Sequence, residues 1–150
     1  MVVIVIVGIL SAIALPSFLS QTSRAKEAEA TANVGAVNRA QEAYFFERRG
    51  VFAPNLTNLQ LGFDATTTHY QYTVQSASKD SAYIDADPIQ SASVRNLYGA
   101  VVKLADDSTR RIICKENDPG TAASVPLVTT GATSANTALG CPIATSFELE

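Results

Sequence analysis

The stretch Met1-Val-Val-Ile-Val-Ile-Val-Gly-Ile-Leu-Ser-Ala-Ile-Ala-Leu15, closed by Pro16, decides how this chain must be organised. Ten of its fifteen residues are Val, Ile or Leu, and the first charged side chain of the whole chain is Arg24. Burying each of the ten is worth about 1.5–3 kcal/mol, or about 15–30 kcal/mol together. Because a whole domain is stable by only about 5–15 kcal/mol, this segment cannot be left in water.

Three environments can remove this segment from water. The first is the chain's own core, but 150 residues make about one domain, and a helix that is apolar all round needs a large one. The second is removal as a secretory signal peptide. Ala12-Ile13-Ala14 does resemble a small-x-small cleavage site, yet no Lys or Arg precedes the apolar run. The third, which we favour, is a bilayer at one stage and other copies of the same helix at another.

From Pro16 to about Arg49 the sequence has a helical period, marked by a stripe of alanines spaced three and four residues apart. The stripe consists of Ala25, Ala28, Ala32, Ala36, Ala40 and Ala43, and Val34, Val37, Tyr44 and Phe45 broaden the apolar face towards the C-terminal end. We expect its C-terminal half to pack on the protein's own sheet and its N-terminal half to let another helix approach closely. Gly50 is the expected C-cap. A helix over residues 1–49 is about 70 Å long, so its apolar half must project from a domain of this size.

Period-two alternation predicts four strands, at residues 69–74, 82–86, 97–104 and 110–115. The short polar links between most of them favour antiparallel neighbours. Residues 50–68 are predicted to be a loop whose leucines and Phe63 fold back onto the core, and residues 121–138 a surface loop. The expected fold class is therefore α+β, with half of one long helix laid across a four-stranded antiparallel sheet. Residues 1–23 are the expected projecting helix and residues 24–150 the globular head.

Two cysteines, Cys114 and Cys141, indicate one disulfide if the chain is exported, and two reduced core cysteines if it is not. The disulfide would close a loop worth about 3–4 kcal/mol in the loop-entropy estimate, and would tether the C-terminal loop. Two cysteines and the single histidine, His69, are too few for a structural zinc site.

The sequence contains no pattern typical of an enzyme: no Gly-rich phosphate loop, no paired histidine ligands and no Gly-x-Ser-x-Gly elbow. We therefore expect no catalytic residue, cofactor or metal. Asp85 with Asp87, and Asp106 with Asp107, are expected to be solvated carboxylates in turns and at strand ends. The net charge of −3 argues against nucleic acid as the main partner.

The segment Met1–Pro16 closely resembles the N-terminal segment of type IV pilins. The continuation Ser17–Gln21, then Ser23-Arg-Ala-Lys-Glu-Ala-Glu29 and Asn38-Arg-Ala-Gln-Glu-Ala-Tyr44, is similar to the same family. It is closest to the major pilins of cyanobacteria and their relatives. The first sixteen residues are specific, the match is good through Gly62, and beyond that only the architecture and the late cysteine pair agree.

The resemblance implies a structural subunit with a long helix and a globular head, stored in the bacterial inner membrane and polymerised by an assembly machinery into an extracellular filament. Such filaments serve adhesion, twitching motility or DNA uptake. The implied membrane helix and filament core consists of Val2, Val3, Ile4, Val5, Ile6, Val7, Ile9, Leu10, Ile13 and Leu15. By similarity to assembled pilins, we expect the helix to melt between Gly8 and Pro16 in the filament and to be nearly continuous in an isolated subunit.

One departure from the family concerns the start of the sequence. Pilins have a basic leader, an N-methylated Phe, and a Glu expected two positions upstream of Met1, and none of these is in the chain. Either the sequence is a truncated piece of a longer protein, which is the interpretation we favour, or the gene product starts at Met1, which would put leader processing and membrane extraction in doubt. Two alternatives share features of the sequence: a pseudopilin of a type II secretion system, and a membrane-tethered periplasmic binding module that uses the helix only as an anchor.

Overall fold

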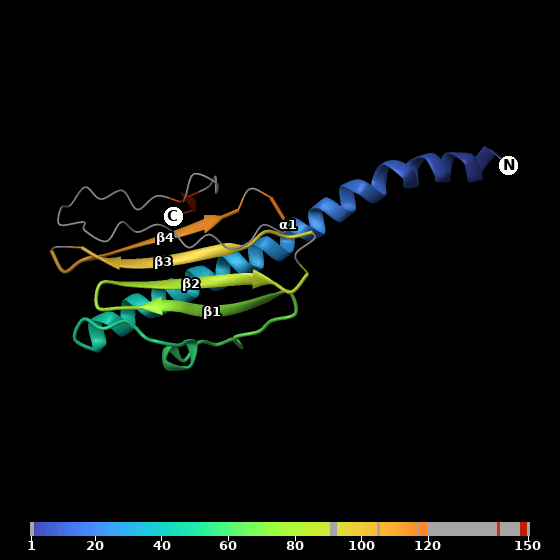
Figure 1. The fold of residues 1–150 in the computed structure, drawn as a ribbon. Coiled ribbons are helices and arrows are strands. Elements are labelled where there is room, and N and C mark those ends of the chain that lie inside the picture. Colours follow the sequence, from blue (N-terminus) through green and yellow to red (C-terminus); the bar gives the residue numbers. More distant parts are fainter. Residues whose placement is uncertain are drawn as a thin grey trace.

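The structure, a computed structural model, describes residues 2–90, 93–104, 106–116, 118–119, 141 and 148–149. One long helix, α1, lies across one face of an antiparallel sheet and continues far beyond it (Figure 1). The long helix, the sheet and their packing confirm the predicted fold class. The surface loop predicted at residues 121–138 lies outside the described residues.

Helix α1 spans Val2–Glu47 and is uninterrupted over all 46 residues, a length of about 69 Å. Gly8 and Pro16 both lie within it. A proline in a helix interior costs about 3 kcal/mol or more and a glycine about 1 kcal/mol, yet α1 continues through both positions. The single chain therefore has the continuous helix expected of an isolated subunit. Melting of Gly8–Pro16 in a filament stays a prediction.

The face of α1 that packs on the sheet agrees with the prediction in part, since the predicted apolar residues Val34, Val37 and Phe45 are buried. The buried side chains are Ala30, Val34, Val37, Asn38, Gln41 and Phe45. Of the alanine stripe, Ala36 and Ala40 are only half-buried, and the other four alanines are exposed. The prediction that the C-terminal half of the stripe packs on the sheet holds only partly, for Ala36 and Ala40, because Val and Phe bury more apolar area than Ala and so determine how the helix turns toward the core.

The end of α1 and the segment after it follow the prediction closely. The amide of Gly50 donates to the carbonyl of Phe45 at 2.9 Å, and both Arg49 and Gly50 have positive φ, of 58° and 80°. This is the Schellman arrangement, in which the chain reverses after the last helical turn. The following loop contains one short 3₁₀ helix, η1 (Leu56–Leu59), whose Asn55 cap accepts from the Asn58 amide at 3.1 Å.

The sheet is an antiparallel meander in the order β1-β2-β3-β4-β5. The four predicted strands are present as β1 (Tyr70–Ala77), β2 (Ser81–Pro88), β3 (Leu97–Lys103) and β4 (Thr109–Lys115). A fifth strand, β5 (Glu148–Leu149), pairs with β4 and was not predicted. Two residues are too few for a recognisable alternation, so this strand has no signal in the sequence.

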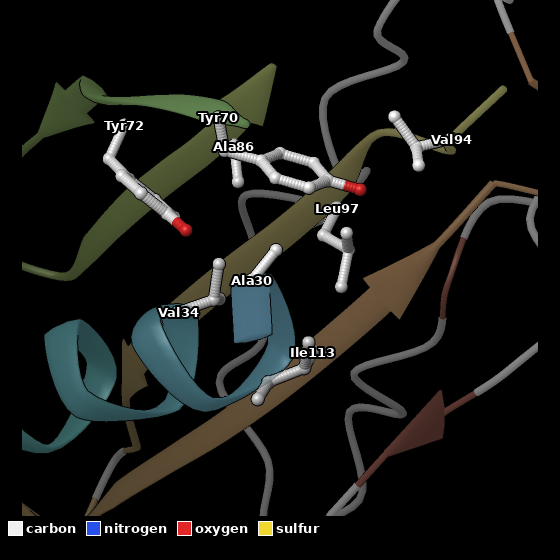
Figure 2. Close-up of a cluster of buried hydrophobic side chains, with 8 residues drawn as sticks. All are labelled: Ala30, Val34, Tyr70, Tyr72, Ala86, Val94, Leu97 and Ile113. Carbon is white, nitrogen blue, oxygen red and sulfur yellow. The ribbon is translucent and has the colours of Figure 1, made fainter. Parts of the chain in front are cut away.

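The main core lies between α1 and the sheet. Figure 2 shows Ala30 and Val34 of α1 facing Leu97 of β3 and Ile113 of β4, with Tyr70 and Tyr72 closing one side. A second cluster joins Phe45 and Phe52 to Ala82 and Val101 nearer the end of α1. These two clusters fill the interface between helix and sheet, so the head has a core that does not use the N-terminal part of α1.

The opposite face of the sheet carries a third cluster, made by Tyr98, Ala100, Ile112 and Cys114. Cys114 forms a disulfide with Cys141, which agrees with the prediction of one disulfide for the pair. The bond attaches the C-terminal part of the chain to β4, on the side of the sheet away from α1. We call this side the outer face of the sheet.

Candidate assembly surface

The N-terminal part of α1 carries the largest run of exposed apolar side chains in the described chain. Their exposed fractions lie between 51% and 72%, in Val2–Val7, Ile9, Leu10, Ile13, Phe18 and Leu19. The side chain of Leu15, the tenth predicted member of this surface, lies outside what the structure describes. Apolar residues lie on every side of the helix here, so no rotation of α1 hides them.

This segment has the dimensions of a membrane span. One helix of the described chain is long and apolar enough to cross a bilayer, and its most apolar window is wholly uncovered by the rest of the chain. The uncharged residues from Val2 to Leu19 cover about 27 Å along the axis, close to the roughly 30 Å of a hydrocarbon core.

The helix is fixed to the head where it leaves the sheet by a partly buried ionic cluster. The carboxylate of Glu27, which is 8% exposed, lies 3.4 Å from Lys115 Nζ and 3.9 Å from Arg95 Nη1. One cation comes from β4 and the other from the link between β2 and β3, so Glu27 joins α1 to two separate parts of the head. The exposed part of α1 is thus anchored to the head only at its C-terminal end.

Two of the open depressions on the surface of the head are lined by α1 together with residues of the sheet. One, of about 420 Å³, lies beside the ionic cluster and is lined by Arg24, Glu27, Ala28, Thr31, Ala32 and Lys115. The other, of about 610 Å³, lies at the C-terminal end of α1 between Phe45, Arg49, Lys79 and Lys103, with Asp80 and Asp107 at its edge. Neither contains the nucleophile, base and orienting group that a catalytic site combines.

The residues singled out for possible chemistry are scattered. Within the described ranges, no three His, Cys, Asp or Glu side chains lie close enough to hold a metal ion. His69 is half-buried just before β1. Asp106 accepts hydrogen bonds from the hydroxyl and amide of Ser108, which lower the pKa of its carboxyl, as expected for a turn.

Asp85 contradicts its prediction. It was expected to be solvated, but it is only 4% exposed and lies on the outer face of the sheet. The alternation of side chains along β2 places Asp85 on the face of the sheet away from α1. Which residues bury that face cannot be deduced from the sequence of β2 alone.

Sequence reasoning also missed the polar side chains that α1 buries against the sheet. Gln41 donates to the carbonyl of Ala53 at 3.0 Å and accepts from the amide of Ala53 at 2.9 Å. Asn38 donates to the carbonyl of Ile112 at 3.0 Å. Glu27, Asn38 and Gln41 share the helical spacing of Ala30, Val34 and Val37, which is the signal that could have revealed their burial.

The comparisons with known proteins agree with this arrangement. Residues 27–142 match the family described as Type IV pilin-like G and H. The chain is also 32% identical, over 145 residues, to the Type IV major pilin protein PilA of Myxococcus xanthus, an alignment that covers 93% of the chain and 60% of that relative. The chain thus spans less than two thirds of the relative's length. A long helix with an uncovered apolar half, a meander sheet and a family match over most of the sequence lead to one conclusion: this chain belongs to the type IV pilin-like G and H family.

Proposed function

We propose that the chain is the structural subunit of a type IV pilus, stored in the inner membrane and polymerised through the N-terminal part of α1 into an extracellular filament. The observation that carries the proposal is the run of apolar side chains from Val2 to Leu19, which nothing in the described chain covers. Before assembly, lipid is the cover; in the filament, neighbouring copies of the same helix replace it. Residues 1–23 form the projecting helix in this proposal and residues 24–150 the head.

The physical basis for a filament is the asymmetry of the molecule. The apolar helix and the head are different surfaces at opposite ends, so contacts between copies are head-to-tail and need not close into a ring. Repeated contacts of this kind produce open helical assemblies. Similarity to a major pilin supports the same role, and the membrane, the assembly machinery and the extracellular location belong to the proposal.

The test compares two matched variants. Ile6 in the apolar segment is 51% exposed and Ile89 on the head is 54% exposed, so a lysine is sterically tolerated at either position. A charge in the hydrocarbon core of a membrane is unfavourable, by about 2.5–3.5 kcal/mol at the centre of a span and less towards its ends. We expect Ile6→Lys to abolish filaments seen by electron microscopy and to reduce retention in the inner-membrane fraction, while Ile89→Lys keeps both.

The outcomes separate the alternatives. Filaments formed by Ile6→Lys as readily as by the unmodified chain would contradict the proposal. An unmodified chain that stays in the inner membrane and never polymerises, with its assembly machinery present, would indicate a tethered binding module. Short periplasmic assemblies that depend on a secretion apparatus would indicate a pseudopilin.

A further inference from the structure

The outer face of the sheet contains a buried carboxylate with an incomplete set of partners. Asp85 of β2 lies opposite Tyr98 of β3 and is 4% exposed. Its Oδ2 atom accepts a hydrogen bond from Gln75 Nε2 at 3.2 Å. Its Oδ1 atom is inaccessible and has no hydrogen-bond partner. The Gln75 amide and the backbone of Ala86, which also favours the charged form, are both neutral. An ionised carboxylate held only by neutral groups is poorly compensated for the loss of water.

The groups nearest to Asp85 are neutral or acidic. Asp87 follows on the same face of β2, and its Oδ1 accepts from Asn96 Nδ2 at 3.3 Å. Glu116, which is 4% exposed, accepts from the hydroxyl of Tyr98 at 2.8 Å. Burial, followed by the charge of Asp87, raises the pKa of Asp85 from 3.8 to about 6, and Glu116 adds to the shift. Burial also raises the pKa of Asp87.

Cations near this cluster in the sequence are engaged elsewhere. Lys115 and Arg95 both lie close to the Glu27 carboxylate. Arg110 lies on the outer face of the sheet, because side chains along β4 alternate between the two faces. However, it is exposed and pairs with Val102, which is four residues along β3 from Tyr98, the residue opposite Asp85. The side chain of β1 that contacts Asp85 is the neutral amide of Gln75.

The C-terminal part of the chain brings no countercharge. Cys141 is bonded to Cys114 on this face, and the sequence on either side of it, residues 119–147, contains no Asp, Glu, Lys, Arg or His. Among the described residues, the titratable groups around Asp85 are therefore Asp87, Tyr98 and Glu116, with Tyr83 two residues before it on β2. What this face lacks is positive charge, and a proton is the smallest source of it.

We propose that the outer face of the sheet contains a proton-binding site centred on Asp85, which makes the head more stable as the pH falls. Protonation turns Oδ1 or Oδ2 into a hydroxyl and removes one of the three negative charges of the cluster. Because Tyr98 pairs with Cys114, the site adjoins the disulfide between Cys114 and Cys141. The proposal does not depend on filament formation.

The sign of the effect follows from linkage. A group with a higher pKa in the folded head than in the unfolded chain binds its proton more tightly when folded. Its stabilising contribution is complete below about pH 3.8 and is lost as the pH rises through about 6. The head should therefore be less stable at pH 8 than at pH 5.

The experiment uses the full chain in neutral detergent micelles, with near-ultraviolet circular dichroism reporting unfolding of the head. We expect the midpoint of thermal unfolding to fall by about 5–10 °C between pH 5 and pH 8. Asp85→Asn removes the charge while keeping the shape, so it should raise the midpoint at pH 8 and flatten the pH profile. Asp64→Asn, an exposed control, should keep the profile of the unmodified chain.

A second measurement covers the case in which Asp85→Asn fails to fold. Carbon-13 NMR of the unmodified chain follows the carboxyl of Asp85 directly, and we expect a titration midpoint near 6. A midpoint near the ordinary value of about 4 would overturn the proposal. So would a midpoint of unfolding that Ca²⁺ raises at pH 8 through Asp85 while protons have no effect, since that would identify a cation site.

Discussion

Gly99 of β3 lies so close to Asn38 of α1 that a Cβ atom at position 99 would sit 2.5 Å from the Oδ1 atom of Asn38. The same Cβ would be 2.7 Å from Cγ1 of Val34. The Asn38 amide cannot move away freely, because its Nδ2 donates to the carbonyl of Ile112 at 3.0 Å. The missing side chain at Gly99 is what allows α1 to settle onto the middle of the sheet.

Gly99→Ala should destabilise the head. Overpacking of a well-filled core costs about 1–3 kcal/mol, and here both the helix and β4 restrict the relaxation. Thermal or urea unfolding of the head measures the change. Gly62→Ala is the matched control, because a Cβ there meets nothing within 4 Å. Equal stability of the two variants would contradict the close contact between α1 and β3.

Gln41→Ala should also be costly, for a different reason. The side chain of Gln41 satisfies both the amide and the carbonyl of Ala53, and it is fully buried. Truncation leaves two backbone groups without partners, at about 1–3 kcal/mol each. Gln71→Ala, at an exposed position of β1, is the comparison. Hydrogen exchange of the Ala53 amide should accelerate in the first variant and stay slow in the second.

Removal of the disulfide should weaken the head without changing its helix. The bond joins Cys114 to Cys141 across 27 positions of sequence, which corresponds to about 3–4 kcal/mol in the loop-entropy estimate. The double variant Cys114→Ala/Cys141→Ala avoids burying free thiols or hydroxyls. Its unfolding midpoint should match that of the unmodified chain treated with a reductant. An unmodified chain that loses no stability on full reduction would argue against a stabilising role for the bond.

Alkaline pH should unfold the head through its buried tyrosines. Burial, followed by the charge of Glu27, raises the pKa of Tyr70 well above 10, and burial also raises the pKa values of Tyr72 and Tyr98. Since each of these pKa values is raised on folding, the associated stability is present below about pH 10 and is lost above it.

Tyrosinate absorbance above pH 10 should therefore show a slow phase that coincides with loss of the circular dichroism of the head. Tyr70→Phe removes one of the three groups, together with a 2.8 Å hydrogen bond to the carbonyl of Arg95. It should lower stability at pH 7 and reduce the further loss at high pH. Tyrosines that all ionise rapidly in a folded head would show that the rings are accessible.

Gly8→Ala should have opposite effects on the isolated subunit, whose helix it stabilises, and on assembly of the proposed filament. A Cβ at Gly8 meets nothing within 4 Å, so the change is free of clashes and strengthens α1 by about 1 kcal/mol. If the segment Gly8–Pro16 melts on assembly, the same gain opposes melting and filament yield should fall. Ala12→Gly weakens the helix by a similar amount and should assemble at least as readily. Equal yields for both variants would argue for an unbroken helix in the filament.

The sheet shows how far alternation in the sequence predicts structure. The starts and ends of the four longer strands were predicted to within three residues. A strand whose two faces meet different environments alternates apolar and polar side chains, and this alternation is visible in the sequence. The strand Glu148–Leu149 was missed because its pairing with β4 depends on where the chain returns, which local sequence does not encode.

The sequence by itself determined that the apolar N-terminal segment cannot be left in water, because its apolarity follows from composition alone. It favoured a partner outside the chain, since a domain of about 150 residues has little core to spare for a helix that is apolar all round. It also determined the long helix and the strands, since both follow from local periods. Only the tertiary structure decided that α1 also buries Glu27, Asn38 and Gln41 and that Asp85 is enclosed. Both depend on what packs against a surface, and that contact is made by residues far away in the sequence.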